Sequence, residues 1–272
     1  MNRASGLILP RRSLAMPAAL VAVALAAACG SSSGSSSTAS STKVSLTGSI
    51  TVSAASSLIG AFGQLGTQFH STHPGATIAF NFGSSGTLAI QIQQGSPADV
   101  FASASPSDMT TVQQAGDIEG TPAIFARNSL EIVVKPGNPL GIHSLADLTK
   151  AKVVAICVST APCGATAEQA LHKSGVSVPS SKVTLGQDVD ATLAEVTTGD
   201  ADAAIVYVTN AKTVANQGVG IPIPASQNVT TSYPIAVVKT TKDLALSRAW
   251  IAYVLSPDGQ KVLRQASFLP AH

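Results

Sequence analysis

Serine and other small residues stand at the predicted starts of several helices, each time directly after a predicted strand. Ser57 follows the strand 50–52 and precedes apolar residues at helical spacing. The segments 81–88 and 162–166 repeat this pattern, and 186–189 precedes a further predicted helix without a predicted strand before it. A helix N-terminus offers free backbone N–H groups and the positive end of a dipole, and serine adds a hydroxyl donor. The pattern therefore indicates an oxyanion site, although a serine at a single helix start is more often only a cap.

The distribution of charge indicates what kind of donor would hold such an anion. No Asp, Glu, Lys or Arg occurs between Lys43 and Asp99, where only His70 and His73 can take up a proton near neutral pH. An anion at the first two helix starts would therefore be bound by neutral donors.

The elements that would position these residues alternate between strand and helix along nearly the whole chain. Beyond the first two units, strands are predicted at 98–102, 129–134, 152–158, 203–208 and 235–238. Helices are predicted at 106–115, 144–148 (with a serine cap), 165–173, 189–198, 208–214, 244–255 and 257–266. Repeated β-α units favour an α/β fold with mainly parallel sheets. In such sheets ligands bind beyond the carboxyl ends of the strands, where the serine-rich turns lie.

The N-terminal region has the features of an export signal. Residues 1–28 combine a basic start with an apolar stretch too short to span a bilayer. The stretch ends in LAAAC, which resembles a bacterial lipobox with Cys29 as the lipidated residue. Residues 29–43 are rich in serine and glycine and would form a flexible tether. The sequence predicts a lipoprotein anchored on the extracytoplasmic face of the cell membrane, with an ordinary secretory signal as the alternative.

The cysteines and the net charge further narrow the class of protein to which the chain can belong. With Cys29 assigned to lipid, Cys157 and Cys163 remain as a disulfide pair in an oxidising compartment, with two free buried thiols as the alternative. No further Cys or His pair has zinc-ligand spacing, so no bare metal ion is expected. Three of the 16 basic residues precede Cys29 and all 14 acidic ones follow it, which leaves a mature charge of about −1. No basic patch indicates nucleic acid as a partner.

Catalytic motifs do not account for the serine-rich turns. Gly83 and Gly86 are three positions apart, so the residues between them do not form the G-x-S-x-G nucleophile elbow. No zinc-protease, P-loop or dinucleotide-binding motif occurs in the sequence. Asp188 and Asp190 are expected to support a helix start rather than to act as an acid-base pair. An exported enzyme acting on an anionic substrate is therefore the alternative to a binding protein.

Seven segments of the chain together resemble the molybdate-binding proteins of bacterial ABC importers. They are ITVSAASSL, FNFGSSGTLAIQI, GSPADVFASAS, ARNSLEIVV, GQDVDATL, AAIVYVTNA and YPIAVV, and they fall between residues 50 and 270. The resemblance implies a two-lobed type II periplasmic-binding-protein fold, each lobe a mainly parallel sheet flanked by helices, with the ligand in the cleft between them. Lobe 1 would consist of residues 44–125 and 235–272, and lobe 2 of residues 126–234.

The resemblance also implies which residues bind the ligand. They are Ser57, Ser85, Cys163, Val189 and Tyr207. The serines and the tyrosine would donate hydroxyl hydrogens, and the other two residues would donate backbone N–H groups. Cys163 stands where the family would have alanine, a change that a backbone donor tolerates. Ser56 is the alternative to Ser57, because the two serines are adjacent.

The implied ligand is molybdate or tungstate, and no cofactor is expected. Sulfate and phosphate are alternative ligands, whereas ferric iron would need more than the three tyrosines present. Molybdate is fully deprotonated near neutral pH, but phosphate usually carries a proton that would need a buried acceptor. The implied partners are the permease and the ATPase of an ABC importer, and the binding protein itself is expected to be a monomer.

Overall fold

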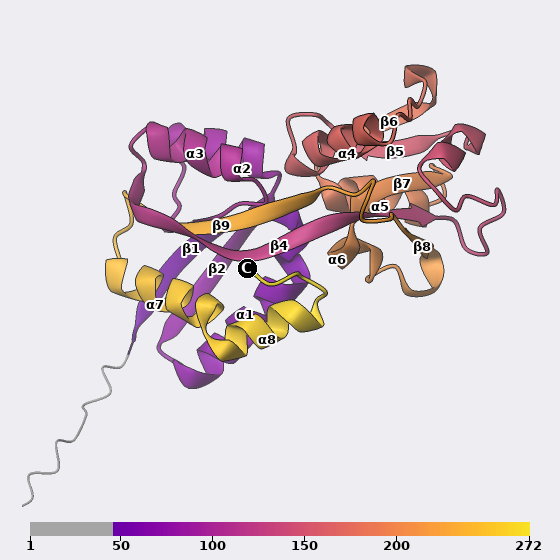
Figure 1. Cartoon of the computed structure of the whole chain (residues 1–272). Helices are drawn as coiled ribbons and strands as arrows, with labels where there is room; N and C mark the ends of the chain where they lie inside the picture. The colour runs from indigo at the N-terminus through magenta and orange to yellow at the C-terminus, as the bar shows by residue number, and fades with distance from the viewer. Residues whose placement is uncertain (1–45) are drawn as a thin grey trace, which may run out of the picture. The chain divides into compact units, whose positions relative to one another are not determined.

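The computed structural model describes residues 46–272. The predicted export signal, the lipidation site Cys29 and the tether lie outside these residues and stay predictions. In the described part, strands and helices alternate as expected (Figure 1). Between residues 46 and 272, no helix has both the length and the apolar character needed to cross a membrane.

The strands and helices have the following bounds within the described residues. The strands are β1 (Gly48–Ala55), β2 (Ala76–Gly83), β3 (Val100–Ala102), β4 (Ile118–Val134), β5 (Val154–Cys157), β6 (Val183–Gly186), β7 (Ala203–Tyr207), β8 (Val219–Pro222) and β9 (Thr230–Val238). The α-helices are α1 (Ile59–Thr72), α2 (Ser85–Gln93), α3 (Pro106–Gln114), α4 (Pro162–Lys173), α5 (Val189–Thr197), α6 (Val208–Ala211), α7 (Leu244–Leu255) and α8 (Pro257–Gln265). The 3-10 helices are η1 (Ser56–Leu58), η2 (Ala146–Lys150), η3 (Ser180–Lys182) and η4 (Ala215–Gln217).

The strands form one continuous mixed sheet. Its order is β2-β1-β3-β9-β4-β7-β5-β6, with β8 paired to β4. The three strands at each end run parallel, and β9 and β4 join the two groups by antiparallel pairing. The α/β fold class is confirmed, and the sheets are mixed rather than mainly parallel. We call β2, β1, β3 and the helices around them the first half, and β7, β5, β6 and theirs the second half.

The strand β4 is much longer than the sequence predicted. A strand was expected only from residue 129, because Gly120 and Pro122 favour a break before it. The extra segment from Ile118 pairs with β9, and register shifts between Glu119 and Ala123 and between Ile124 and Ala126 accommodate the irregular residues. Long-range pairing therefore overrides the local signal. The short strands β6 and β8 were not predicted, because neither has a run of strongly apolar residues.

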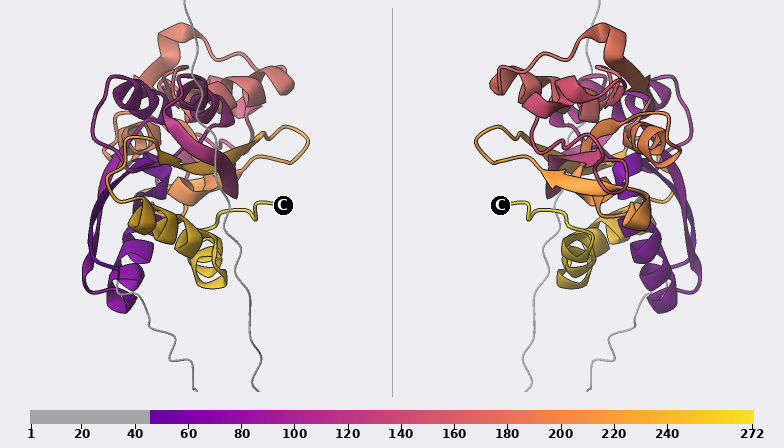
Figure 2. Two further views of the ribbon diagram at one scale, coloured as in Figure 1. Left: turned by 90° about the vertical axis from the view of Figure 1, so that its left-hand side faces the viewer. Right: turned by 90° about the vertical axis from the view of Figure 1, so that its right-hand side faces the viewer.

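Helices cover both faces of the first half. Figure 1 shows α2 and α3 on one face and α1, α7 and α8 on the other, and the side views of Figure 2 show the same separation. The short strand β3 contributes to both layers, because Phe101 packs in the cluster beneath α2 and α3 whereas Val100 packs in the larger core. This alternation follows from the two-residue period of a strand. The result is a three-layer arrangement in which β1 and β2 end at the same edge.

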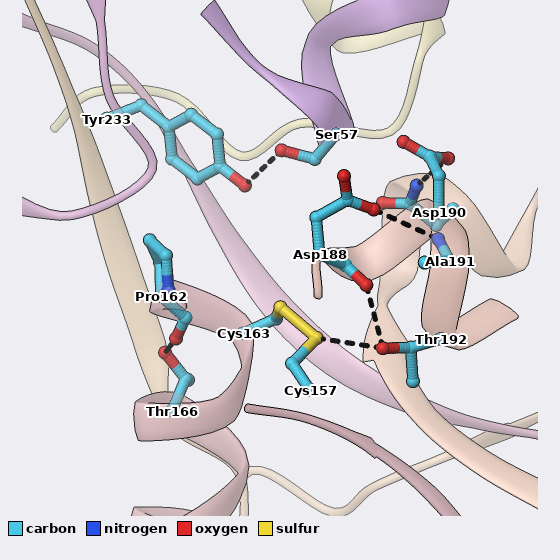
Figure 3. Close-up of a disulfide and its surroundings, with 11 residues drawn as sticks. Ser57, Cys157, Pro162, Cys163, Thr166, Asp188, Asp190, Ala191, Thr192 and Tyr233 are labelled. Carbon is cyan, nitrogen blue, oxygen red and sulfur yellow. Dashed lines mark hydrogen bonds between the residues drawn. A yellow bond between two sulfur atoms is a disulfide. The ribbon is translucent and has the colours of Figure 1, made fainter. Parts of the chain in front are cut away.

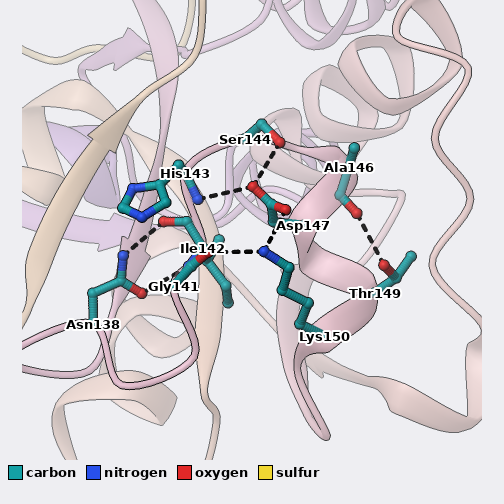
Figure 4. A network of polar contacts seen from close by, with 9 residues as sticks. All are labelled: Asn138, Gly141, Ile142, His143, Ser144, Ala146, Asp147, Thr149 and Lys150. Atoms are coloured by element: carbon teal, nitrogen blue, oxygen red, sulfur yellow. Dashed lines mark hydrogen bonds and ion pairs between the residues drawn. The ribbon is translucent and has the colours of Figure 1, made fainter.

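The connection between β4 and β5 corrects one predicted detail. A helix with a serine cap was expected at 144–148, but η2 begins at Ala146 and the Ser144 hydroxyl donates to Asp147 at 2.9 Å instead of accepting from the backbone. Lys150 lies 2.7 Å from the same carboxylate (Figure 4). Lys150 first, then the His143 N–H and the Ser144 hydroxyl, hold the pKa of Asp147 below its ordinary value. The acidic side chain, not the serine, organises this turn.

Candidate oxyanion site

The starts of several helices meet at one small cavity. The helices α2, α4 and α5 each follow a parallel strand, and η1 leads from β1 into α1. Their first residues line a small cavity that leaves about 10 Å³ for the centre of a water-sized molecule, far less than the roughly 300–1,000 Å³ of a typical drug-sized pocket. The lining residues are Ala55, Ser56, Ser57, Gly83, Ser84, Ser85, Ala104, Ala161, Pro162, Cys163, Asp188, Val189 and Tyr207. All five residues predicted to bind the ligand are among them.

Ser85 is the first residue of α2, immediately after β2. It is buried, and its Oγ accepts a hydrogen bond of 2.9 Å from the backbone N–H of Ala104. No acceptor for the Ser85 hydroxyl hydrogen occurs among the described residues. Ser84 precedes it as the helix cap residue, but its side chain forms no capping hydrogen bond. Ser85 therefore has a hydrogen available for a ligand at the cavity.

Ser57 lies in η1, directly after β1. Its Oγ is 2.9 Å from the hydroxyl oxygen of Tyr233 on β9, and Figure 3 shows the two groups facing each other. The adjacent Ser56 is also buried and also lines the cavity. Tyr233 is a side-chain partner that fixes the Ser57 hydroxyl in place, whereas Ser56 lies beside the carboxyl group of Asp190. The prediction that Ser57 rather than Ser56 contacts the ligand is consistent with this geometry.

Tyr207 has a buried hydroxyl with no partner among the described residues. It is the last residue of β7, so its side chain lies at a strand end beside the helix starts. Burial, followed by the nearby Tyr233, raises the pKa of Tyr207 well above its ordinary value, so the phenol stays protonated at neutral pH. An unpaired buried hydroxyl costs free energy. An acceptor in the cavity would remove that cost.

Two backbone donors complete the cavity wall. Cys163 is the second residue of α4, after Pro162, and Val189 is the first residue of α5. The N–H groups of a first helical turn have no partner within the helix. Both residues line the cavity, so the positive ends of two helix dipoles lie beside it.

A disulfide between Cys157 and Cys163 fixes the start of α4, which confirms the predicted pairing (Figure 3). Cys157 ends β5, so the bond joins the strand end directly to the helix start. Gly164 follows, and a Cβ there would lie 2.6 Å from the Cys157 carbonyl oxygen, so only glycine fits. The Thr192 hydroxyl of α5 donates to the Asp188 carbonyl oxygen at 2.7 Å and also points to Cys157 Sγ at 3.2 Å. These contacts hold the starts of α4 and α5 together.

Carboxylates near the cavity are engaged elsewhere. Asp188 caps α5, where its Oδ1 accepts from the Ala191 N–H at 2.9 Å, as the sequence predicted. Asp190 lines a second cavity that also borders Ser57, and one of its buried oxygens has no partner among the described residues. Burial, then repulsion from Asp188, raises the pKa of Asp190 to about 6, while Ser56 and Asn210 act in the opposite direction. At neutral pH the carboxylate disfavours an anion in that second cavity.

Three residues close to the site were missed by sequence reasoning. They are Asn128, Asp190 and Tyr233. Asn128 and Tyr233 lie in the parts of β4 and β9 that precede the predicted strands 129–134 and 235–238, and Asp190 was expected merely to support a helix start. The YPIAVV segment contained Tyr233, but nothing in a strand pattern tells which buried hydroxyl reaches a neighbouring serine.

Comparison with known proteins places the chain in a family. The model of the family "Bacterial extracellular solute-binding protein" matches residues 50–269. Molybdate-binding protein ModA of Mycobacterium tuberculosis is 40% identical over 219 residues, which cover 80% of this chain and 83% of the relative. The fold is similar to that of the Azotobacter vinelandii periplasmic molybdate-binding protein, with a TM-score of 0.73 at 21% identity over 81% of this chain and 98% of that one. The sulfate-binding protein SubI from Mycobacterium tuberculosis has a TM-score of 0.75 at 19% identity, over 82% of this chain and 86% of that one. The chain belongs to the bacterial extracellular solute-binding protein family.

Proposed function

We propose that this protein captures molybdate or tungstate outside the cytoplasm and delivers it to an ABC importer. The oxyanion would lie in the small cavity, where the hydroxyls of Ser57, Ser85 and Tyr207 and the N–H groups of Cys163 and Val189 donate to it. Because its family consists of solute-binding proteins, the chain is a binder rather than an enzyme. The name of the Mycobacterium tuberculosis relative supports molybdate as the ligand.

One observation carries the proposal: hydroxyl hydrogens without acceptors converge on a cavity lined by helix starts. Ser85 already accepts a hydrogen bond, and Tyr207 has no partner among the described residues, so both hydroxyls are free to donate. A small dianion would accept from these hydroxyls and from the orphan N–H groups together. No lysine or arginine lines this cavity. Neutral, prepositioned donors therefore supply the binding free energy.

The predicted binding groups are all donors, and this predicts a ranking of tetrahedral oxyanions. Molybdate and tungstate are expected to bind similarly, sulfate much more weakly because it is smaller, and phosphate negligibly. Phosphate carries a proton near neutral pH, and leaving that hydrogen unpaired in a dry cleft costs roughly 1–3 kcal/mol. Calorimetric titrations of the four anions at one neutral pH and one buffer test this ranking. Phosphate binding as strong as molybdate binding would contradict it.

The two halves would act as lobes that close on the anion. The chain is predicted to cross between the lobes at residues 125–126 and 234–235, which lie within β4 and β9. These two strands pair with each other and join the two end groups of the sheet. We propose residues 44–125 with 235–272 as lobe 1 and residues 126–234 as lobe 2. Ser57 and Ser85 would then bind from lobe 1, and Cys163, Val189 and Tyr207 from lobe 2. With the donors divided between the lobes in this way, the lobes would have to close for all of the donors to contact the anion.

Membrane attachment is a separate proposal that depends on the N-terminal sequence. Cleavage before Cys29 and lipidation of that residue would tether the binding protein by residues 29–43 close to the permease and ATPase. Mass spectrometry of protein extracted from membranes is expected to find a diacylglyceryl-modified Cys29 as the first residue. Recovery of the native protein from the medium, with Cys29 unmodified or absent, would contradict the anchor.

The disulfide is expected to support binding as well as stability. Its short loop constrains the unfolded chain by only about 2 kcal/mol in the chain-entropy model. Because the bond also fixes the start of α4, reduction is expected to weaken molybdate binding beyond what the loss of stability explains. Titration of oxidised and reduced protein, with unfolding free energies measured on the same samples, tests the role. Equal affinities would limit the disulfide to a role in stability.

A further inference from the structure

A chain of buried hydrogen bonds connects Ser57 at the oxyanion cavity to Asp190 on α5. It runs through β9, β4 and α6, and so passes between the two halves of the molecule. Its links are Ser57–Tyr233 (2.9 Å), Tyr233–Asn128 (3.3 Å), Asn128–Thr209 (2.9 Å), Thr209–Asn210 (3.2 Å) and Asn210–Asp190 (2.9 Å). All members except Asp190 are fully or almost fully buried. The two central members, Asn128 and Tyr233, are fully buried.

The direction of each bond can be worked out from the Asp190 end. A carboxylate only accepts, so Asn210 must direct its Nδ2 to Asp190. The amide oxygen of Asn210 then faces Thr209, whose hydroxyl donates to it. Since Thr209 has only one hydrogen, its oxygen accepts from Asn128. This end of the chain therefore requires the Nδ2 group of Asn128 to face the network.

The backbone beside Asn128 gives the same orientation independently. The Oδ1 atom of Asn128 accepts from the Ser129 N–H at 3.0 Å, which leaves Nδ2 to donate to both Thr209 and Tyr233. The Tyr233 oxygen accepts from Asn128, so its own hydrogen goes to the nearby Oγ of Ser57. Burial raises the pKa of Tyr233 above its ordinary value, so that hydrogen is retained. Ser57 thus accepts from the protein and its hydroxyl hydrogen remains free for the cavity.

We propose that Asn128 is a specificity-determining positioning residue that, through Tyr233, fixes the Ser57 hydroxyl as a donor toward the bound anion. The inference rests on the proposed function, because it requires a tetrahedral oxyanion in the cavity. The Ser85 hydroxyl is also fixed as a donor, because its oxygen accepts from the backbone N–H of Ala104, and no side-chain substitution removes that N–H. Ser57 is therefore the position at which side chains decide whether the site also accepts a hydrogen from its ligand. With Asn128 present, an anion that carries a proton finds no acceptor at Ser57.

The substitution Asn128→Asp reverses the direction of the hydrogen bonds that link residue 128 to Tyr233 and Tyr233 to Ser57. A carboxylate at this position accepts from Tyr233, so Ser57 must then donate to the Tyr233 oxygen. The Ser57 oxygen would be left as an acceptor facing the ligand. The site would lose a donor for fully deprotonated anions and gain a partner for a protonated one. Its preference between two anions of similar size should change accordingly.

Selenate and arsenate make this comparison, since near neutral pH selenate carries no proton and arsenate carries at least one. The wild-type protein is expected to prefer selenate. Asn128→Asp is expected to lower selenate affinity about tenfold or more and to reduce the selenate-to-arsenate affinity ratio by at least about tenfold. Tyr233→Phe removes the hydroxyl that orients Ser57 and is expected to reduce the same ratio. Tyr253→Phe, which removes a tyrosine hydroxyl bonded to Gln68 away from the cavity, should leave the ratio unchanged.

The affinity ratio separates positioning from a general loss of structure. If Asn128→Asp and Tyr233→Phe weaken both anions by the same factor, the positioning role is wrong while the proposed function stands. If Asn128→Asp does not fold, Tyr233→Phe decides the question by the same ratio. If the wild-type protein binds molybdate but does not prefer selenate to arsenate, the inference is also wrong. If it binds none of these anions, the proposed function itself fails.

Discussion

Replacing Ser85 with alanine is expected to weaken molybdate binding roughly 10- to 150-fold, the equivalent of about 1.5–3 kcal/mol for a hydrogen bond to a charged group. The hydroxyl is buried at the cavity, and its hydrogen has no acceptor among the described residues. Ser57→Ala should have an effect of similar size. Calorimetric titration measures both. Because Ser85→Ala also removes the acceptor of the Ala104 N–H, the unfolding free energy of the ligand-free protein is measured alongside.

The neighbouring serines provide matched controls. Ser84 precedes α2 but forms no capping hydrogen bond, so Ser84→Ala is expected to change affinity little. Ser56→Ala serves the same purpose beside Ser57. If Ser56→Ala and Ser84→Ala reduce affinity and the other two substitutions do not, the serine assignment is wrong by one residue in each turn.

The positions of the donors could be predicted from sequence because each depends on local structure. A strand followed by a small residue and an amphipathic helix specifies a helix start, and parallel strands bring such starts to one edge of the sheet. That rule gathers Ser57 with Ser85 and Cys163 with Val189, each pair within one half. The antiparallel pairing through β4 and β9 then turns the two sets of strand ends toward one cavity. The family resemblance then assigned the individual binding residues, and it alone indicated Tyr207, because a tyrosine at the end of a buried strand has no distinctive pattern of its own.

The arrangement behind the donors could not be predicted in the same way. Asn128 lies in the part of β4 just before the predicted strand 129–134, and its partners come from β9 and α6, about 80 to 105 residues further along the chain. The direction of their hydrogen bonds depends on which side chains meet, and a strand pattern does not specify this. Local signals thus located the donors, whereas long-range pairing determines how their hydrogens are directed.

Replacing Gly86 with alanine is expected to weaken molybdate binding about 5- to 150-fold without destabilising the ligand-free protein. Gly86 is the second residue of α2 in the first half, and a Cβ there would lie 2.5 Å from the carbonyl oxygen of Thr160 in the second half. The oxygen belongs to the backbone and Cβ is bonded directly to it, so no side-chain rotation relieves the contact. Overpacking of this kind costs about 1–3 kcal/mol, and here that cost opposes the closed arrangement of the two halves.

The effect should be confined to binding because α2 itself tolerates alanine. Alanine favours a helix over glycine by about 1 kcal/mol, so the unfolding free energy of the ligand-free protein is not expected to fall. Gly63→Ala is the matched control, since it makes the same change within α1, where nothing lies within 4 Å of the added Cβ. It should leave molybdate affinity unchanged. An unchanged affinity for Gly86→Ala as well would mean that the halves need not approach this closely to bind the anion. Weakened binding together with an intact ligand-free fold would show that closure at Gly86 contributes directly to affinity.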